Sequence, residues 1–298
     1  MSREHRAGGA WYLVLMIWGG RYGDEHCNRI IAAVFEHSRN CSGAVVLTDR
    51  MDRRIDERAR KVPISEYFDT PRMKSRGLPV KISMFDIPEV PAGATCIYLD
   101  LDTVVIGNLD RLAALAREAP IWTIPVFPRP FSRLYRTLWR LSRRAIYTIG
   151  NSSAFVYRNG FKGNPTQIFR DLSERDRLPE DLYHDDRFIA WACQDKIRGL
   201  PINDVVNFRF EFLAPTLWLS DLFSLLRRRG RQKIAAITFA GPETKPETLL
   251  GLPYGSVVKD HHGRVGRWND FHTSGLRDKM IRSYTKPSSQ ANAQGGPL

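Results

Sequence analysis

Continuous apolar runs, rather than alternating ones, mark the first strands that the chain predicts. Residues 11–18 (WYLVLMIW) and 44–48 (AVVLT) are such runs, which are typical of strands buried on both faces of a sheet. Between them, Asp24 can cap a helix in which Ile31 and Phe35 share one face. A strand, a helix and a second strand in this order predict parallel pairing with a right-handed crossover.

The same alternation continues toward the C-terminus. We expect strands at residues 95–99, 121–126, 154–157 and 234–239, and a helix at residues 108–117. Strands that alternate with helices predict an α/β fold, here an α/β/α sandwich around a Rossmann-like, mostly parallel sheet.

The domain organisation expected from the sequence is simple. No repeat or linker interrupts residues 11–284, so we expect one domain over this range. Residues 1–10 are polar and are expected to be a flexible start. Residues 285–298, rich in Ser, Gln, Asn, Gly and Pro, are predicted to be a disordered tail.

Charge and cysteine content indicate which partners and which cellular compartment the chain suits. The 298 residues carry a net charge of +13 at pH 7, which favours anionic partners such as phosphorylated ligands, anionic lipid or nucleic acid. The four cysteines have no C-x-x-C spacing, which argues against a zinc site and indicates reduced thiols. Residues 11–18 are too short to span a membrane and lack a signal-peptide pattern. We therefore expect a cytoplasmic protein, with the inner membrane face as a candidate surface for peripheral attachment.

Two segments, residues 131–146 and 217–233, combine apolar side chains at helical spacing with many arginines. Basic amphipathic helices of this kind are typical of segments that lie on an anionic membrane surface, and they also suit a lipid-linked acceptor. The alternative is an ordinary surface helix whose apolar face packs on the protein core.

The clearest candidate for chemistry is a pair of carboxylates at the end of an apolar strand. Asp100 and Asp102 flank Leu101 directly after residues 95–99. In open α/β sheets, ligands bind at the carboxyl ends of strands. Carboxylate oxygens suit Mg²⁺ or Mn²⁺, and such an ion can bridge a diphosphate and stabilise a leaving nucleotide. The alternative is that the two aspartates only form a turn or a helix cap.

Three further groups of residues could contact a polar or phosphorylated ligand. Gly19 and Gly20 follow the first strand and would let the backbone approach a nucleotide, although a simple turn would use them too. Asn151 and Ser152 offer neutral hydrogen bonds to sugar hydroxyls, with an ordinary polar turn as the alternative. Lys245 can neutralise a phosphate, or it can be a solvated surface lysine.

These pieces give the chain a resemblance to a known family. Residues 98–110 (YLDLDTVVIGNLD) resemble the D-x-D segment of bacterial glycosyltransferases related to glycosyltransferase family 8. Other stretches resemble this family in the expected order along the chain: residues 18–29 and 47–49 its nucleotide-binding region, residues 81–85 its lysine-containing segment, residues 150–154 the stretch facing the donor sugar, and residues 239–246 the late loop over the diphosphate.

The resemblance implies a GT-A fold and transfer of a sugar from a nucleotide-diphosphate donor, with a UDP-sugar favoured, to a hydroxyl acceptor. The acceptor would be a carbohydrate or a lipid-linked molecule, in polysaccharide or glycolipid synthesis, and no nucleic acid is expected as a partner. Asp100 and Asp102 would hold Mn²⁺ or Mg²⁺, and Asp185 and Asp186 would act on the sugar. The donor-binding residues that it implies are Trp18, Gly19, Gly20, Tyr22, Thr48, Lys81, Asp100, Leu101, Asn151, Ser152, Gly241 and Lys245.

Two positions depart from the family pattern. Relatives have a metal-binding histidine before the glycine of the late loop, where this chain has Ala240. His261 and His262 are candidates to replace it, with exposed surface histidines as the alternative. Relatives also often carry Asp-Gln-Asp where this chain has Asp185-Asp186-Arg187, in which Asp185 can instead cap a helix. These departures bear on metal binding and activity more than on the fold.

Two other functions compete with glycosyl transfer. Residues 100–104 (DLDTV) also fit the nucleophile motif of haloacid dehalogenase-type phosphatases, in which Asp100 would attack phosphorus and Asp102 would act as acid and base. That motif normally follows the first strand, whereas about a hundred residues of α/β chain precede it here. The second rival is a non-catalytic protein that binds nucleotide-sugars or an anionic surface.

Overall fold

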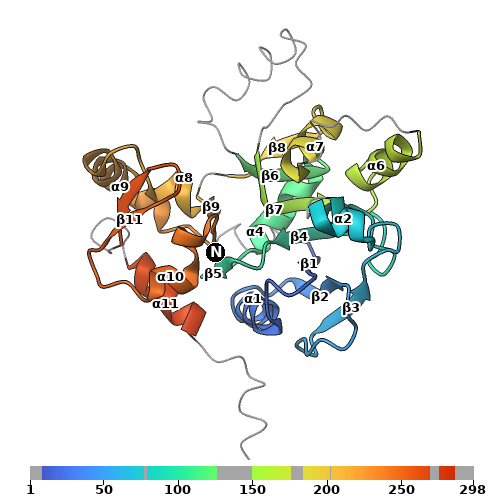
Figure 1. Ribbon diagram of the computed structural model, residues 1–298, viewed down its shortest axis with the longest axis horizontal. Helices are drawn as coiled ribbons and strands as arrows, with labels where there is room; N and C mark the ends of the chain where they lie inside the picture. Colours follow the sequence, from blue (N-terminus) through green and yellow to red (C-terminus); the bar gives the residue numbers. More distant parts are fainter. Residues whose placement is uncertain are drawn as a thin grey trace, which may run out of the picture. The chain divides into compact units, whose positions relative to one another are not determined.

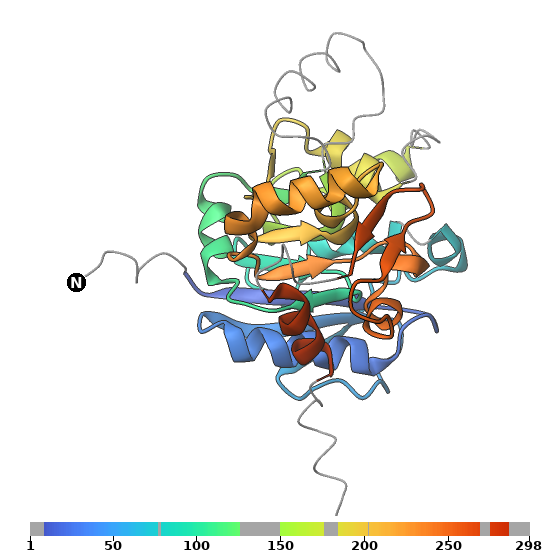
Figure 2. The same ribbon diagram turned by 90° about the vertical axis from the view of Figure 1, so that its left-hand side faces the viewer.

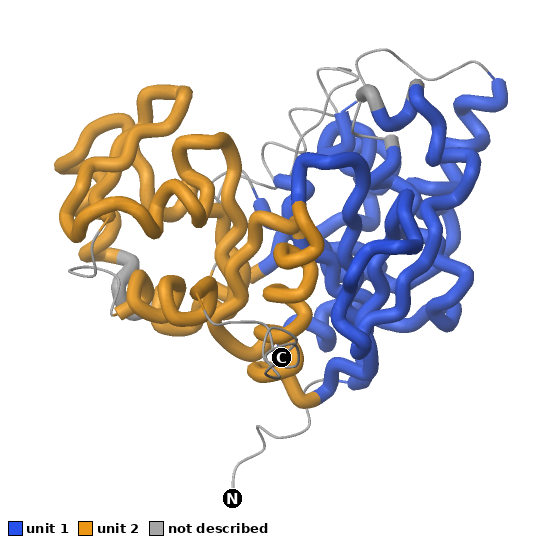
Figure 3. Tube along the Cα trace, turned by 60° about the horizontal axis from the view of Figure 1, so that its bottom comes forward, with its two compact units in different colours: residues 1–22, 40–99, 110–200 blue, residues 23–39, 100–109, 201–298 orange. Residues whose placement is uncertain are grey.

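A computed structural model describes residues 9–76, 79–125, 150–175, 184–201, 203–268 and 275–285. The chain divides into two compact units (Figure 3). Unit 1 contains Met1–Tyr22, Asn40–Leu99 and Asp110–Leu200, and unit 2 contains Gly23–Arg39, Asp100–Leu109 and Pro201–Leu298. The units interleave along the chain, so neither is a separate stretch of sequence. The single domain expected over residues 11–284 stays a prediction.

Unit 1 is built on a seven-stranded sheet with the order β3-β2-β1-β4-β7-β6-β8 (Figure 1). Its strands are β1 (Trp11–Ile17), β2 (Cys41–Thr48), β3 (Ala59–Pro63), β4 (Thr95–Leu99), β6 (Ile121–Pro125), β7 (Gly150–Arg158) and β8 (Ile197–Gly199). Strand β7 runs antiparallel to both of its neighbours, and all other neighbouring pairs are parallel. The mixed α/β fold with a mostly parallel sheet is therefore confirmed, as is the parallel pairing of the first two strands.

The apolar runs form strands because both faces of the sheet are buried. Val14 and Tyr98 belong to a core cluster on one face, while their neighbours Leu13 and Ile97, which point to the other face, are equally buried. Phe169 and other apolar residues of the helices complete the cluster. The helices of unit 1 are α2 (Pro71–Arg76), α3 (Pro79–Ile82), η2 (Ser83–Phe85), α4 (Asp110–Ala113), η3 (Ala114–Arg117), α6 (Pro165–Glu174) and α7 (Asp185–Ala192).

Unit 2 has a smaller core centred on aromatic rings. Phe208 stacks on Phe212 and on Phe239, and Trp268 meets it edge-on. Its strands form a sheet of β5 (Thr103–Val105), β10 (Ala236–Thr238) and β9 (Val205–Asn207), and a hairpin of β11 (Val257–Lys259) and β12 (Val265–Arg267). Its helices are α1 (Asp24–His37), α8 (Phe208–Phe212), α9 (Leu217–Arg231), η6 (Pro242–Thr244), α10 (Pro246–Leu250) and α11 (Leu276–Thr285).

Some element boundaries differ from the expected ones. Gly23, not Asp24, is the cap of α1, and Asp24 is its first helical residue. The helix expected at residues 108–117 is a short α4 followed by the 3₁₀ helix η3, and the strand expected at residues 234–239 is only three residues of β10. The basic segment at residues 131–146 and the tail at residues 286–298 lie outside the described residues. None of the helices in the described part is long and apolar enough to cross a membrane.

Candidate functional site

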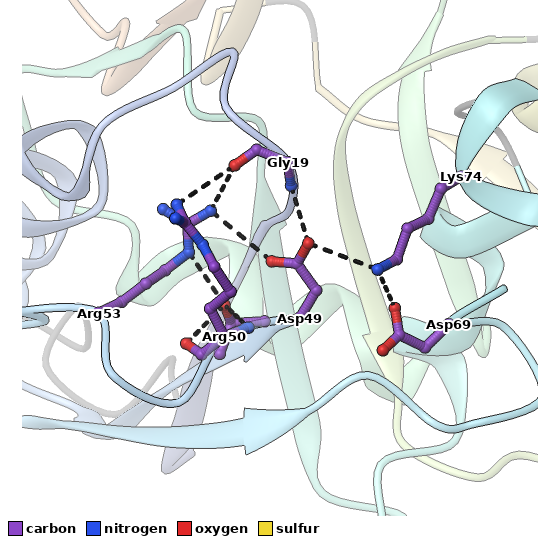
Figure 4. Close-up of polar contacts among 7 residues, drawn as sticks. Gly19, Asp49, Arg50, Arg53, Asp69 and Lys74 are labelled. Carbon is purple, nitrogen blue, oxygen red and sulfur yellow. Dashed lines mark hydrogen bonds and ion pairs between the residues drawn. The ribbon is translucent and has the colours of Figure 1, made fainter. Parts of the chain in front are cut away.

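The turn after β1 is held by side chains that follow β2 (Figure 4). Gly19 has φ 62°, a left-handed conformation that favours glycine. Its amide donates to Oδ2 of Asp49 at 3.0 Å, and its carbonyl accepts from Nη2 of Arg53 at 2.7 Å. Both backbone groups of this glycine are therefore fixed by residues that directly follow the neighbouring strand.

Arg53 joins the ends of β1 and β2. It is almost fully buried, and besides Gly19 its Nε donates to Oγ1 of Thr48 at 3.1 Å. Thr48 is the last residue of β2 and is fully buried, so it acts here as an internal hydrogen-bond partner. One guanidinium thus ties the carboxyl ends of two parallel strands, the edge where ligands bind in such sheets.

Asp49 is surrounded by positive charge. Lys74 lies 3.5 Å from its Oδ2 and 2.5 Å from Oδ1 of Asp69, and Arg53 lies 3.7 Å from its Oδ1. Burial alone would raise the pKa of Asp49, but the Gly19 hydrogen bond and the charges of Lys74 and Arg53 outweigh burial and lower this pKa. The Asp49 carboxylate therefore stays charged where it accepts the hydrogen bond from Gly19.

Trp18, Gly20 and Tyr22, also predicted around the nucleotide, lie on or beside the same turn, whereas Thr48 ends β2 and Lys81 lies on α3. Trp18 is partly buried against the core cluster of unit 1. Gly20 is exposed, and nothing lies within 4 Å of a methyl group built on it. The guanidinium of Arg21 lies 5.5 Å from the ring centre of Tyr22. This turn presents open backbone beside two aromatic rings.

Three of the predicted residues meet inside unit 1. Ser152 donates to Oδ2 of Asp185 at 2.7 Å, and the ammonium of Lys81 lies 3.4 Å from the same oxygen and 3.3 Å from Oγ of Ser152. All three side chains are buried, and Lys81 also lies over the ring of Tyr98 at 5.1 Å. Three residues predicted from distant segments of the sequence therefore form one compact polar cluster.

Strand β7 is irregular where it supplies Ser152. Phe155 pairs with Thr123 on β6, but the next pair is Asn151 with Ile124, so the residues between have no partner on β6. Such bulges bend a strand and re-aim its side chains, often near functional sites. Asn151 accepts from the amide of Ser153 through its Oδ1 at 3.0 Å, and both residues belong to β7 and not to the polar turn that was the alternative.

The two acidic residues of α7 begin that helix. His184 is the cap, so Asp185 is its first residue and not its cap, and Oδ1 of Asp185 accepts from the amide of Asp186 at 2.8 Å. Burial, and then the negative charge of Asp185, raise the pKa of Asp186. Arg187 donates its amide to Asp186 at 2.7 Å. The raised pKa makes Asp186 a stronger base than an ordinary aspartate.

In unit 2, the D-x-D segment forms the turn between β4 and β5. Leu101 is buried, and the amide of Thr103 donates to the carbonyl of Asp100 at 3.1 Å. Asp102 is mostly buried, and its Oδ2 accepts from the ammonium of Lys245 at 2.8 Å. The predicted phosphate-binding lysine is therefore paired with a predicted metal ligand.

Lys245 is positioned by the late loop. It lies between η6 and α10, as the cap of α10. Gly241 begins the loop with φ 83°, and a methyl group built on it would lie 3.0 Å from Nδ1 of His261. The carbonyl of Ala240 accepts from the side chain of Thr244. The loop thus requires glycine at position 241, and the hydrogen bond between Thr244 and Ala240 stabilises its beginning.

The histidines considered as metal ligands lie beside an arginine. Nη2 of Arg209 lies 3.3 Å from Nδ1 of His261. Nε of the same arginine lies 3.0 Å from Oδ2 of the buried Asp260. Glu243 lies 3.7 Å from His261, and the ring of His262 packs on that of His261 at 4.1 Å. No three Asp, Glu, His or Cys side chains come together as a metal cluster among the described residues.

Sequence reasoning did not name Arg53 or Lys74, and it included Asp49 only within residues 47–49, the stretch that resembles the nucleotide-binding region. Asp49 carried a usable signal, because it follows a buried strand directly, as Asp100 does. Arg53 and Lys74 are cations among many and have no such signal. A pocket of unit 1 lined by Leu47, Ser83 and Arg170, among others, contains none of the individually predicted site residues, although Leu47 and Ser83 belong to two of the resembling stretches.

The chain matches no protein-family model and no curated protein. Among solved structures it is similar to the apo form of the glycosyltransferase GlyE of Streptococcus pneumoniae TIGR4, with a TM-score of 0.49 and 12% identity, over 95% of this chain and 62% of that one. It thus spans less than two thirds of the length of GlyE. It is also similar to the galactosyltransferase LgtC in complex with donor and acceptor sugar analogues, with a TM-score of 0.45 and 13% identity, over 95% of this chain and 99% of that one. A third is mouse xyloside xylosyltransferase 1, with a TM-score of 0.43 and 11% identity, over 76% of this chain and 97% of that one.

Proposed function

We propose that this protein is a GT-A glycosyltransferase that takes a sugar from a nucleotide-diphosphate donor. The observation that carries the proposal is the place of the D-x-D segment. From β1 the chain goes to β2 and β3 on one side, whereas β4 lies on the other side of β1 and parallel to it. The carboxyl ends of β1 and β4 therefore flank a point where the strand order reverses, which is where open α/β sheets bind ligands. Asp100 and Asp102 follow β4 directly.

The turn after β1 is assigned to the nucleotide. Trp18 and Tyr22 offer aromatic surface, Gly20 offers open backbone, and Gly19 shapes the turn. Arg53 and its neighbours hold this turn in one conformation, so little ordering remains to be done when the donor binds.

The diphosphate is assigned to the D-x-D segment and the late loop. Lys245 already neutralises Asp102, so the side chain of Asp102 faces a cation in this structure. Asp100 and Asp102 have the hard oxygens that Mn²⁺ or Mg²⁺ requires, and Mg²⁺ is commonly held by one or two carboxylates together with substrate phosphates. Such an ion would stabilise the negative charge of the departing nucleoside diphosphate. With the donor bound, Lys245 would pair with a phosphate oxygen instead of Asp102.

The donor sugar is assigned to the cluster of Ser152 and Asp185. Three donors already contact Asp185: Ser152, Lys81 and the amide of Asp186. A carboxylate has about four acceptor positions, so one further donor such as a sugar hydroxyl can be accepted. Asn151 lies beside this cluster on β7 and adds a neutral amide.

The reaction breaks the bond between the anomeric carbon and the diphosphate oxygen, and it forms a bond from that carbon to an acceptor hydroxyl oxygen. The acceptor proton must leave at the same time. Asp186 is the candidate to take it, because its raised pKa makes it a stronger base than an ordinary aspartate. Carbohydrate or lipid-linked acceptors, in polysaccharide or glycolipid synthesis at the cytoplasmic membrane face, are the setting that we propose.

The test is calorimetric titration of UDP, with and without Mn²⁺, on the wild type and on Asp102→Asn. We expect binding that is stronger with Mn²⁺ and that weakens at least about tenfold in Asp102→Asn, since charge-assisted contacts contribute about 1.5–3 kcal/mol. Asp52→Asn removes the same charge at an exposed position and should bind as the wild type does. Release of UDP from a panel of UDP-sugars then identifies the donor.

Three outcomes would change the proposal. UDP binding of equal strength with and without Mn²⁺ would support the donor site and contradict the proposed metal site. No binding of UDP or any other nucleoside diphosphate would contradict the transferase. Phosphate release from a generic phosphomonoester, abolished by Asp100→Asn, would favour the phosphatase instead.

A further inference from the structure

Helix α9 exposes large apolar side chains. Of the eight large hydrophobic residues that are exposed in the described part of the chain, five lie on this one helix: Trp218, Leu222, Phe223, Leu225 and Leu226. Trp218 is 65% exposed and Leu226 is 71% exposed. Single exposed apolar residues are common on soluble proteins, but a gathering of this kind marks an interaction surface.

Four of the five form a stripe along α9. Trp218, Leu222, Leu225 and Leu226 are separated by four, seven and eight positions from the first of them, which is the spacing of a single helix face. Phe223 flanks this stripe. The apolar stripe, defined as these four residues, therefore faces solvent, which reverses the usual arrangement of a surface helix.

The opposite face of α9 fixes the helix to unit 2. Ser220 and Ser224 are buried there, and Oγ of Ser220 donates to the carbonyl of Phe212 at 2.8 Å. A methyl group built on Gly266 of β12 would lie 3.1 Å from that Oγ and 2.5 Å from the carbonyl of Phe212, so the helix approaches the hairpin closely. Figure 2 shows α9 in orange beside β12 in red.

The C-terminal end of α9 is anchored by charge. Arg231 is buried, and its Nε donates to Oε1 of Glu211 at 2.9 Å, while Nη2 donates to the carbonyl of Glu211 at 2.6 Å. Its guanidinium also lies 4.5 Å from the ring centre of Phe212. Small residues and one buried ion pair hold the helix, so the apolar stripe is not needed for packing.

We propose that the apolar stripe of α9 docks on an anionic lipid bilayer. Asp221 is the one acid in the helix sequence, and Arg267 lies 3.2 Å from it and neutralises it. Three arginines, residues 227–229, follow the stripe in the sequence, and the whole chain carries +13 at pH 7. A helix with Trp and Leu along one face and basic residues adjacent to it in the sequence is the kind that lies in a membrane interface.

Charge also decides against a second copy of this chain as the occupant. Two molecules that each carry +13 repel each other, whereas an anionic bilayer attracts both. The proposal does not depend on the transferase assignment, because no residue of α9 is assigned to donor binding or catalysis.

The test is co-sedimentation of the full chain with vesicles of phosphatidylcholine alone and of phosphatidylcholine mixed with phosphatidylglycerol. We expect binding to the mixed vesicles that weakens with added salt. The double variant Leu222→Gln/Leu226→Gln should bind at least about 100-fold more weakly, since burial of each leucine strengthens binding at least about tenfold. Met51→Gln is the matched control, because Met51 is equally apolar, 50% exposed and in unit 1.

Trp218 gives a second measurement. Lipids brominated on their acyl chains should quench part of the tryptophan fluorescence of the wild type, and Trp218→Phe should still sediment but lose that quenching. Equal sedimentation of the wild type and the double leucine variant would overturn the proposal. So would equal binding to both vesicle types, or a dimer seen by light scattering that the leucine variant abolishes without any vesicle binding.

Discussion

The ammonium of Lys245 lies 2.8 Å from Oδ2 of Asp102, and both side chains are mostly buried. A protein cation thus holds the carboxylate that the D-x-D resemblance assigns to a metal ion. Lys245 contacts one oxygen of Asp102, so a metal ion at this carboxylate would compete with the ammonium for the same negative charge unless Lys245 pairs with another anion. The donor diphosphate that we propose would be such an anion, and the ion pair would then couple metal binding to nucleotide binding.

Replacing Lys245 should therefore change the two affinities in opposite directions. In Lys245→Ala, Asp102 loses its competitor and Mn²⁺ binding to the protein alone should strengthen about tenfold, while UDP binding should weaken about tenfold, as loss of one charged contact predicts. Electron paramagnetic resonance of free Mn²⁺ measures the Mn²⁺ affinity, and calorimetry measures the UDP affinity. Lys259→Ala removes the same charge from exposed β11 and should change neither. An unaltered Mn²⁺ affinity in Lys245→Ala would separate the lysine from the metal site.

The buried pair of Lys81 and Asp185 should be strongly coupled. Lys81→Met leaves the Asp185 carboxylate buried without its cation, and the free energy of unfolding should fall by about 3–5 kcal/mol. The double variant Lys81→Met/Asp185→Leu should be less destabilised than the sum of the single variants. Urea unfolding measures all of these.

The control for this cycle is an exposed ion pair of the same chain. Arg267 and Asp221 lie 3.2 Å apart with side chains 40% and 33% exposed, so Arg267→Met should change stability by less than about 1 kcal/mol. Additive effects of Lys81→Met and Asp185→Leu would mean that the two groups do not interact in solution.

Gly19 and Gly20 form a matched pair for testing the turn after β1. A methyl group on either one meets nothing within 4 Å, but only Gly19 has a positive φ, of 62°. Gly19→Ala should therefore cost about 1–2 kcal/mol through backbone strain alone and should weaken UDP binding, whereas Gly20→Ala should be near neutral in stability. Thermal unfolding and UDP titration check both. Equal effects of the two substitutions would show that Gly19 is not held in this conformation.

The sequence predicted five of the seven strands of the large sheet, β1, β2, β4, β6 and β7, but not β3 and β8. The runs that became β1, β2 and β4 are apolar on both faces, which few other structures require. The short strands β5, β9 and β11 gave no comparable signal, since three residues are too few for any periodicity. Their pairing is decided by tertiary contacts in the core of unit 2.

The site was predicted in part, and the reason is similar. Lys81, Ser152 and Asp185 were selected through the family resemblance, and the structure brings them together. The role of Arg53 could not be predicted, because its value depends on reaching the carbonyl of Gly19 across 34 positions of chain. Helix α9 matched the pattern of an amphipathic helix, but the pattern alone did not reveal that its apolar side faces outward.

The buried thiol of Cys193 gives a pH-dependent test of the core of unit 1. Burial raises the pKa of Cys193 from 9.0 to about 12, with nearby Lys196 opposing the rise. In the unfolded chain the thiol loses its proton near pH 9.0, while in the folded chain it keeps it to about pH 12. The contribution of Cys193 to stability is therefore fully present below pH 9.0 and is lost as pH rises toward about 12.

Cys193→Ala removes this dependence. Between about pH 7 and about pH 10, the wild type should lose about 1.4 kcal/mol more of its unfolding free energy than Cys193→Ala does, since one pH unit above the unfolded pKa corresponds to that amount. Urea unfolding at both pH values measures the difference. Cys193→Val should show the same pH dependence as Cys193→Ala, although the two differ in packing at about pH 7. Parallel pH profiles for the wild type and Cys193→Ala would mean that water reaches this thiol in the folded protein.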